Sequence, residues 1–161
     1  MTDVPVRILG LADSLRDRES SEPPGGENSR ARVLVVDDEQ ALRSALVRLL
    51  EFHDDFEVVG QAADGQAALE RIGEADVDLV VMDLRMPVLG GIEATRLIRE
   101  RHSTVRVVLL SAYNDQGLIA EALGAGAFDY LIKGCTAAQL YETLERAWRH
   151  PRPVGEAGPD A

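Results

Sequence analysis

Hydrophobic and polar residues alternate in blocks along the central part of the chain. Short apolar runs rich in Val, Leu and Ile are typical of strands buried on both faces. Between them lie longer segments whose apolar residues recur at helical spacing. The runs predict five strands, at residues 32–36, 57–63, 78–83, 105–111 and 127–133. The spacing predicts five helices, at residues 40–52, 65–75, 90–102, 115–126 and 136–150, the last capped by Thr136. This alternation predicts a parallel sheet with helices on both faces.

The two ends of the chain differ in composition from this central part. Residues 19–30 are rich in Ser, Pro, Gly and Glu, and residues 150–161 are broken by Pro and Gly. We therefore expect a disordered N-terminal extension at 1–30, one domain at 31–149 and a disordered C-terminal tail at 150–161. The scattered apolar residues of 4–17 leave open a short docking peptide as the alternative to a plain tail.

Charge and cysteine content limit the partners and the compartment. The formal net charge of −11 argues against non-specific binding to nucleic acid and against docking on an anionic membrane, but leaves a basic protein partner open. No apolar run is long enough to span a bilayer, and the first residues do not resemble a secretion signal. With Cys135 as the only cysteine, these features favour the cytoplasm.

Polar side chains follow the predicted strands at their carboxyl ends. Asp37 and Asp38 come after the first strand and Asp83 ends the third. Ser111 ends the fourth strand, and Lys133, the only lysine of the chain, ends the fifth. Because the carboxyl ends of parallel strands share one edge of the sheet, we expect these side chains to converge.

Such a group has a definite chemistry. Three clustered carboxylates repel one another unless a cation joins them, and oxygen ligands at this density suit Mg²⁺. A lysine ammonium is a compact counter-ion for a phosphoryl oxygen, and a hydroxyl can donate to another. The set therefore predicts a phosphoryl site beside a metal, where one carboxylate accepts the group as an acyl phosphate.

Four segments carry a family resemblance. In this order and spacing, "VVDDE" (35–39), "MDLRMPVLGG" (82–91), "LLSAYND" (109–115) and "YLIKG" (130–134) resemble the receiver domain of two-component response regulators. The resemblance covers 31–149. It implies a flavodoxin-like, doubly wound α/β fold, with a five-stranded parallel sheet in the order 2-1-3-4-5 and five helices.

The resemblance also implies roles for the acidic residues. Asp83 would be the phosphoacceptor. Asp38 and Asp83 would ligate Mg²⁺ directly, together with the backbone carbonyl of Arg85. Asp37 would help through a water molecule, and Pro87 would end the acceptor loop.

Further roles concern the phosphoryl group and its surroundings. Ser111 and Lys133 would contact the phosphoryl oxygens, and Tyr130 would be the switch aromatic whose position follows the movement of Ser111. Tyr113 and Arg85 stand where they can shield the acyl phosphate, although a half-exposed loop aromatic is an equal interpretation of Tyr113. Two residues are assigned to packing instead: Cys135 and Trp148.

One departure from many receivers indicates a branch of the family. Gly134, rather than a proline, follows Lys133, which is similar to the NarL/LuxR-type branch, as are "ADGQAAL" (63–69) and "GAGAFDYLIK" (124–133). Members of that branch normally carry a helix-turn-helix output domain after the receiver. The sequence has no room for one, so we expect a stand-alone receiver or one whose output domain is lost or removed.

The predicted function is a phosphoacceptor switch. A sensor histidine kinase would donate the phosphoryl group, and the fourth helix, fifth strand and fifth helix would change packing and contact an unknown downstream protein or a second copy in a homodimer. The chain would catalyse only its own phosphorylation and dephosphorylation, and would bind neither nucleic acid nor membrane itself. A phosphorelay shuttle or phosphate sink, and the receiver module of a transcription regulator, are the alternatives.

Three other classes fit the sequence poorly. Asp83 is not followed by the second acid of an Asp-x-Asp phosphatase, and the acidic loop after the first strand would repel the phosphate of FMN. The G-x-x-x-x-G-K-[ST] loop of a P-loop nucleotidase is absent. A receiver that signals without phosphorylation stays open.

Overall fold

The computed structural model describes residues 29–150. The predictions of a docking peptide at 4–17 and of disorder before residue 29 and after residue 150 lie outside the described residues. Among the residues described, no helix combines the length and the apolar character that crossing a bilayer requires.

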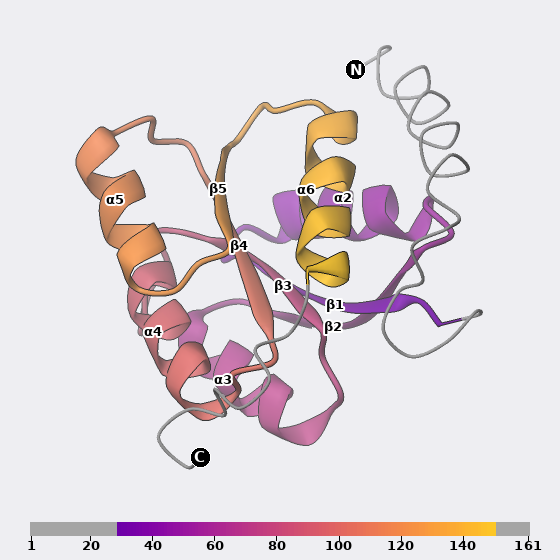
Figure 1. Ribbon diagram of the computed structural model, residues 1–161, viewed down its shortest axis with the longest axis horizontal. Helices are drawn as coiled ribbons and strands as arrows, with labels where there is room; N and C mark the ends of the chain where they lie inside the picture. The colour runs from indigo at the N-terminus through magenta and orange to yellow at the C-terminus, as the bar shows by residue number, and fades with distance from the viewer. Residues whose placement is uncertain (1–28, 151–161) are drawn as a thin grey trace.

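Five parallel strands form one sheet in the order β2-β1-β3-β4-β5, as predicted (Figure 1). The strands are β1 (Ala31–Val36), β2 (Phe56–Ala62), β3 (Leu79–Asp83), β4 (Arg106–Ser111) and β5 (Asp129–Ile132). The order reverses where β1 lies between β2 and β3. Ligands of doubly wound sheets bind beyond the carboxyl ends of the strands at such a reversal.

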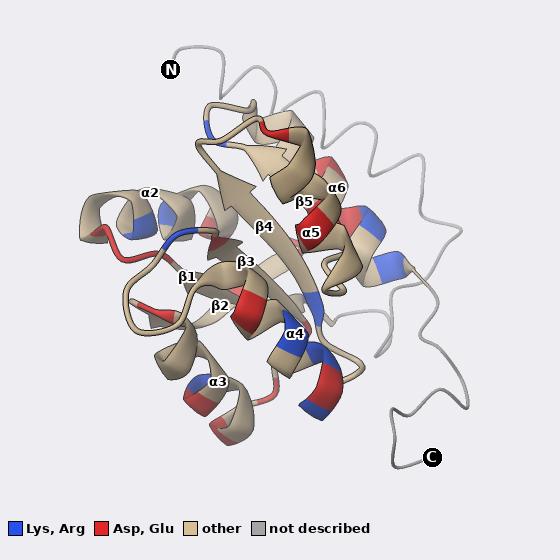
Figure 2. Ribbon diagram, turned by 90° about the vertical axis from the view of Figure 1, so that its left-hand side faces the viewer, with Lys and Arg blue, Asp and Glu red and all other residues tan. Residues whose placement is uncertain are grey.

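Five helices cover the two faces of the sheet. Successive residues of a strand point to opposite faces, so the apolar runs supply two cores. On one face, α2 (Gln40–Glu51) and α6 (Ala137–Arg149) pack on the strands. On the other lie α3 (Gly65–Glu74), α4 (Gly91–Arg101) and α5 (Gln116–Gly124). Figure 2 shows the charged residues mainly on helices and loops, while the strands are mostly tan.

The element ends differ from the predictions by one or two residues. The largest differences are at α5, predicted at 115–126, and at β5, predicted at 127–133. The residues flanking β5 still bond to β4, because the Phe128 amide donates to the Val107 carbonyl at 2.7 Å and the Lys133 amide to the Ser111 carbonyl at 2.6 Å. Thr136 is the N-cap of α6, and its side chain accepts from the Gln139 amide in a capping box.

Candidate functional site

The sheet brings the predicted polar residues to one edge. Asp37 directly follows β1, Asp83 and Ser111 are the last residues of β3 and β4, and Lys133 directly follows β5. Asp83 pairs in register with Leu110, the residue before Ser111, so the strand ends lie side by side. The convergence expected from the sequence is therefore present.

The carboxylates of Asp37, Asp38 and Asp83 form one group, which we call the acidic cup. Their ligand atoms lie within 4.8 Å of one another, a spacing that can hold a metal ion. Asp37 is 1% exposed and Asp83 is 9% exposed, whereas Asp38 lies open to solvent. Buried carboxylates with one open member suit a cation that keeps part of its water shell.

Lys133 is the cation of the acidic cup. Its Nζ lies 3.1 Å from Asp83 Oδ1 and 3.3 Å from Asp37 Oδ2. Burial lowers the pKa of Lys133, but the hydrogen bond and the charge of Asp83, followed by Asp37, outweigh burial and leave this pKa raised. The ammonium is therefore held charged between two carboxylates.

Lys133 does not fully offset the effects that raise the pKa of Asp83. Burial raises the pKa of Asp83, and the negative charge of Asp37 raises it further. The hydrogen bond and charge of Lys133, and the Leu84 amide that donates to Oδ1 at 2.9 Å, oppose this rise without cancelling it. A further cation in the acidic cup would stabilise the ionised Asp83.

The loop after β3 is held close to Asp83 by a glycine. The Gly91 amide donates to the Leu84 carbonyl at 2.8 Å, and a Cβ at Gly91 would collide with the Asp83 carbonyl oxygen. Within the same loop, Val88 has a φ of 68°, in the left-handed region that β-branched residues avoid. The loop thus combines close packing at one end with backbone strain at its exposed tip.

Ser111 and Tyr130 are connected through one residue, Tyr113. The Tyr113 amide donates to Ser111 Oγ at 3.0 Å, and the Tyr130 hydroxyl donates to the Tyr113 carbonyl at 2.6 Å. Both Ser111 and Tyr130 are buried. Tyr113 therefore links the Ser111 hydroxyl to the Tyr130 hydroxyl by two hydrogen bonds, and the coupled movement of Ser111 and Tyr130 stays a prediction.

Arg85 and Tyr113, the two residues expected to shield the site, lie against each other. The Arg85 guanidinium is 4.6 Å from the centre of the Tyr113 ring, a cation–π geometry. Tyr113 is 46% exposed, so the half-exposed interpretation and the contact with Arg85 both hold. Shielding by this pair, and metal ligation by the Arg85 carbonyl, stay predictions.

The sequence did not single out Arg43 of α2. Its Nη1 donates to the Asp37 carbonyl at 2.6 Å, and its Nε donates to Gln61 Oε1 of β2 at 3.2 Å. The position, six residues after Asp37 on a helix, was the available signal. Arg43 fixes the backbone of the acidic cup and leaves its carboxylates to other partners.

Cys135 and Trp148 agree with their assignment to packing. Burial raises the pKa of the Cys135 thiol, which makes it less reactive. Cys135 lines a cavity of about 180 Å³ together with Lys133 and the apolar side of α2, including Leu42 and Leu46. Trp148 is buried in the core beneath α6.

Known proteins share both this sequence pattern and this fold. Residues 33–145 match the family model of the response regulator receiver domain. The transcriptional regulatory protein LnrK of Bacillus subtilis is 40% identical over 113 residues, which are 70% of this chain and 51% of LnrK. The chemotaxis protein CheY of Listeria monocytogenes is 33% identical over 116 residues, covering 72% of this chain and 97% of CheY.

A solved structure agrees with these sequence comparisons. The two-component response regulator of the LuxR family from Aurantimonas sp. SI85-9A1 has a TM-score of 0.73 and 35% identity, covering 82% of this chain and 92% of that one. The chain spans about half the length of the curated regulators it matches first. It belongs to the response regulator receiver domain family, with the NarL/LuxR-type resemblance that its sequence predicts.

Proposed function

We propose that Asp83 accepts a phosphoryl group from the phosphohistidine of a sensor histidine kinase. The observation that carries this proposal is the position of the Asp83 carboxylate, buried between the Lys133 ammonium and the other carboxylates of the acidic cup. In the transfer, a carboxylate oxygen of Asp83 bonds to phosphorus as the phosphorus–nitrogen bond breaks. The histidine keeps the electron pair and Asp83 becomes an acyl phosphate.

The acidic cup fits Mg²⁺ as the cofactor of this reaction. The donors are all oxygens, and the raised pKa of Asp83 indicates that burial and Asp37 are not fully balanced by Lys133. We propose Asp38, Asp83 and the Arg85 carbonyl as direct ligands, with Asp37 acting through water. The ion would supply positive charge that stabilises the phosphoryl oxygens during transfer.

The residues around the acidic cup have separate proposed tasks. Lys133 pairs with one phosphoryl oxygen by a charge-assisted hydrogen bond. Ser111 already accepts a hydrogen bond from the Tyr113 amide, so its own proton is available for another phosphoryl oxygen. Arg85 and Tyr113 lie together and limit the access of water to the acyl phosphate.

We propose that phosphorylation changes the face formed by α5, β5 and α6. A phosphoryl group adds a charge of about −1.5 to −2, which draws Ser111 toward the acidic cup. Because Tyr113 bonds to both Ser111 and Tyr130, this movement alters the packing of Tyr130 in β5. The changed face then contacts a downstream protein or a second copy of the chain.

The names of the relatives support two settings for this switch. LnrK, of which the chain spans about half, is named a transcriptional regulatory protein, so we also propose the chain as the receiver module of a transcription regulator. CheY, of which the chain spans nearly all, supports a receiver that acts alone by protein contact, or as a shuttle or sink for phosphoryl groups. The net charge of −11 favours protein contact over direct nucleic-acid binding.

Phosphorylation of the full chain with Mg²⁺ and acetyl phosphate tests the proposal. We expect one phosphoryl group per chain by mass spectrometry, and none in Asp83→Asn. Asp76→Asn is the matched control. Asp76 is exposed, and its ion pair among the described residues is with Arg32, which is partly exposed. Labelling of Asp83→Asn to the level of the unaltered chain would contradict the proposal.

A further inference from the structure

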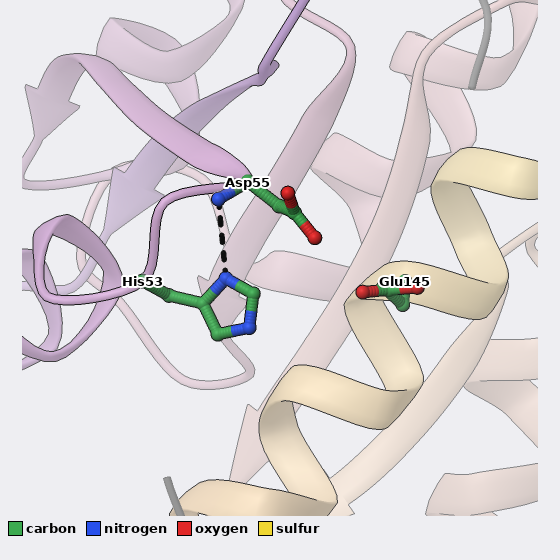
Figure 3. A group of neighbouring side chains, drawn as sticks. All are labelled: His53, Asp55 and Glu145. Atoms are coloured by element: carbon green, nitrogen blue, oxygen red, sulfur yellow. Dashed lines mark hydrogen bonds between the residues drawn. The ribbon is translucent and has the colours of Figure 1, made fainter. Parts of the chain in front are cut away.

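A second group of potential metal ligands lies at the opposite, amino edge of the sheet. His53 and Asp55 belong to the turn between α2 and β2, and Glu145 belongs to α6 (Figure 3). Each residue offers one ligand atom, and the three atoms lie within 4.8 Å of one another. The residues that form this turn–helix cluster are separate from the acidic cup.

His53 provides an independent indication of a ligand. The residue is 6% exposed, and its ring lies tilted against two aromatic rings, with the ring centres 4.9 Å from Phe56 and 4.7 Å from Tyr141. Its Nδ1 accepts a hydrogen bond from the Asp55 amide at 3.2 Å, whereas its buried Nε2 has no hydrogen-bond partner. Figure 3 shows Nε2 on the side of the ring that faces Glu145. A buried ring nitrogen without a partner is costly, and a bound ion would remove that cost.

The two carboxylates complete a mixed donor set. Glu145 is fully buried, and its Oε1 accepts from the Arg149 Nε at 2.7 Å. Burial is the main cause that raises the pKa of Glu145, and Asp55 adds to the rise while Arg149 opposes it. One imidazole nitrogen and two carboxylate oxygens are ligands that zinc-class ions accept, with water in the fourth position. Mg²⁺ prefers oxygen ligands alone, so the two edges of the sheet differ in the ion they suit.

We propose that His53, Asp55 and Glu145 bind a divalent transition-metal ion of the zinc class. The ligand atoms are His53 Nε2 and one carboxylate oxygen from each acid. Asp55, which is only partly buried, gives the ion its path from solvent. The site would join the α2–β2 turn to α6.

Metal binding changes a hydrogen bond next to the site. While Nδ1 accepts the Asp55 amide, the neutral ring carries its proton on Nε2. Binding at Nε2 requires that this proton leave and that the ring be protonated on Nδ1 instead, so the Asp55 amide loses its acceptor. The Asp55 amide resonance is therefore a direct reporter of the site.

Titration with Zn²⁺ tests this inference on the full chain. The background variant Asp38→Asn/Asp83→Asn removes two acids of the acidic cup, so that binding there does not obscure the result. In this background we expect one Zn²⁺ per chain by calorimetry, and a shift of the Asp55 amide in NMR spectra after one equivalent. His53→Gln should weaken Zn²⁺ binding at least about tenfold.

His102→Gln is the matched control, since His102 is the C-cap that follows α4 and belongs to neither group of potential metal ligands. It should bind Zn²⁺ as the background does. If His53→Gln does not fold, Glu145→Gln replaces it with the same expected loss. Unchanged Zn²⁺ affinity in either folded variant, or an Asp55 amide that does not move with one equivalent, would overturn the proposal. None of these results depends on phosphorylation of Asp83.

Discussion

The two edges of the sheet each gather carboxylates around one basic side chain, but they are built differently. In the acidic cup, Asp37, Asp83 and Lys133 come from three strand ends that are far apart in the sequence. In the turn–helix cluster, Glu145 and its cation Arg149 are one turn apart on the same helix. The first arrangement exists only when the sheet is assembled, whereas the second pair needs only α6 to form.

The difference extends to exposure and to the cation itself. Asp38 leaves the acidic cup open to solvent, and the flexible lysine is a compact charge that can follow a phosphoryl group. Glu145 is enclosed, and the planar fork of Arg149 holds it in place. This difference in exposure fits the two proposals made above, a phosphoryl group that is exchanged at the carboxyl edge and a cation that is held at the amino edge.

Loss of Lys133 should have the largest effect and should separate the two edges. We expect Lys133→Met to lower the rate of phosphorylation from acetyl phosphate about 100-fold, because one preorganised donor to the phosphoryl group is removed. Arg149→Met should leave that rate unchanged. Lys133→Arg keeps the charge but not the compact shape, and should still impair phosphorylation or the switching that follows. Quench-flow or mass spectrometry measures the phosphorylation rate of the unaltered chain and of the three variants. Equal rates in all four proteins would show that the Lys133 ammonium does not contribute to phosphorylation.

Loss of Arg149 should act on stability instead. Arg149→Met leaves the buried Glu145 carboxylate without its partner at 2.7 Å, and we expect the free energy of unfolding to fall by about 1–3 kcal/mol. Urea denaturation measures this change. Arg96→Met is the control, because Arg96 pairs with Glu93 at an exposed position of α4 and should change stability by less than about 0.5 kcal/mol. A similar effect of both variants would remove the distinction between enclosed and open pairs.

The pH dependence of stability should distinguish the edges by their response to Mg²⁺. The pKa values of Asp83 and Glu145 are raised above their ordinary values of 3.8 and 4.5. In the window above these values the native carboxyl groups keep protons that the unfolded chain has released, so Asp83 and Glu145 each make the free energy of unfolding fall as pH rises. His53, whose pKa is lowered by burial, contributes in the opposite direction.

Denaturation from about pH 4 to about pH 7 measures this slope. We expect Mg²⁺ to remove the contribution of Asp83 to this slope, which is the contribution that Asp83→Asn also removes. The contribution of Glu145, which Glu145→Gln removes, should persist in Mg²⁺. A slope that Mg²⁺ abolishes entirely would mean that the turn–helix cluster does not contribute.

The smallest expected effect on stability comes from backbone strain at the carboxyl edge of the sheet. Among the described residues, Val88 in the loop beside Asp83 is the single non-glycine with a positive φ. Val88→Gly relieves this strain but makes the unfolded chain more flexible, so we expect a net stabilisation of up to about 1 kcal/mol. Val47→Gly, in the middle of α2, should destabilise the chain and serves as the contrast. Thermal unfolding of both variants checks the opposite signs.

The sequence predicted most of the fold because its strands are continuous apolar runs and its helices have regular apolar spacing. Those signals are local, so the element ends were found to within one or two residues. β5 was predicted too long because its flanks bond to β4 outside the regular ladder. The residues of the acidic cup were found because they stand at strand ends. Two hydrogen bonds were not foreseen, because they depend on side-chain and loop geometry. One runs from Arg43 to the Asp37 carbonyl, and the other from the Tyr113 amide to Ser111 Oγ.

By itself, the sequence determined the succession of strands and helices and placed Asp37, Asp83 and Lys133 at strand ends, because burial and periodicity act over short stretches of chain. Only the tertiary structure decided that Lys133 lies between two carboxylates, and that His53 faces Glu145 across 92 residues of sequence. The physical reason is that both contacts depend on strand order and on how α6 packs on the sheet, and neither leaves a pattern in neighbouring residues.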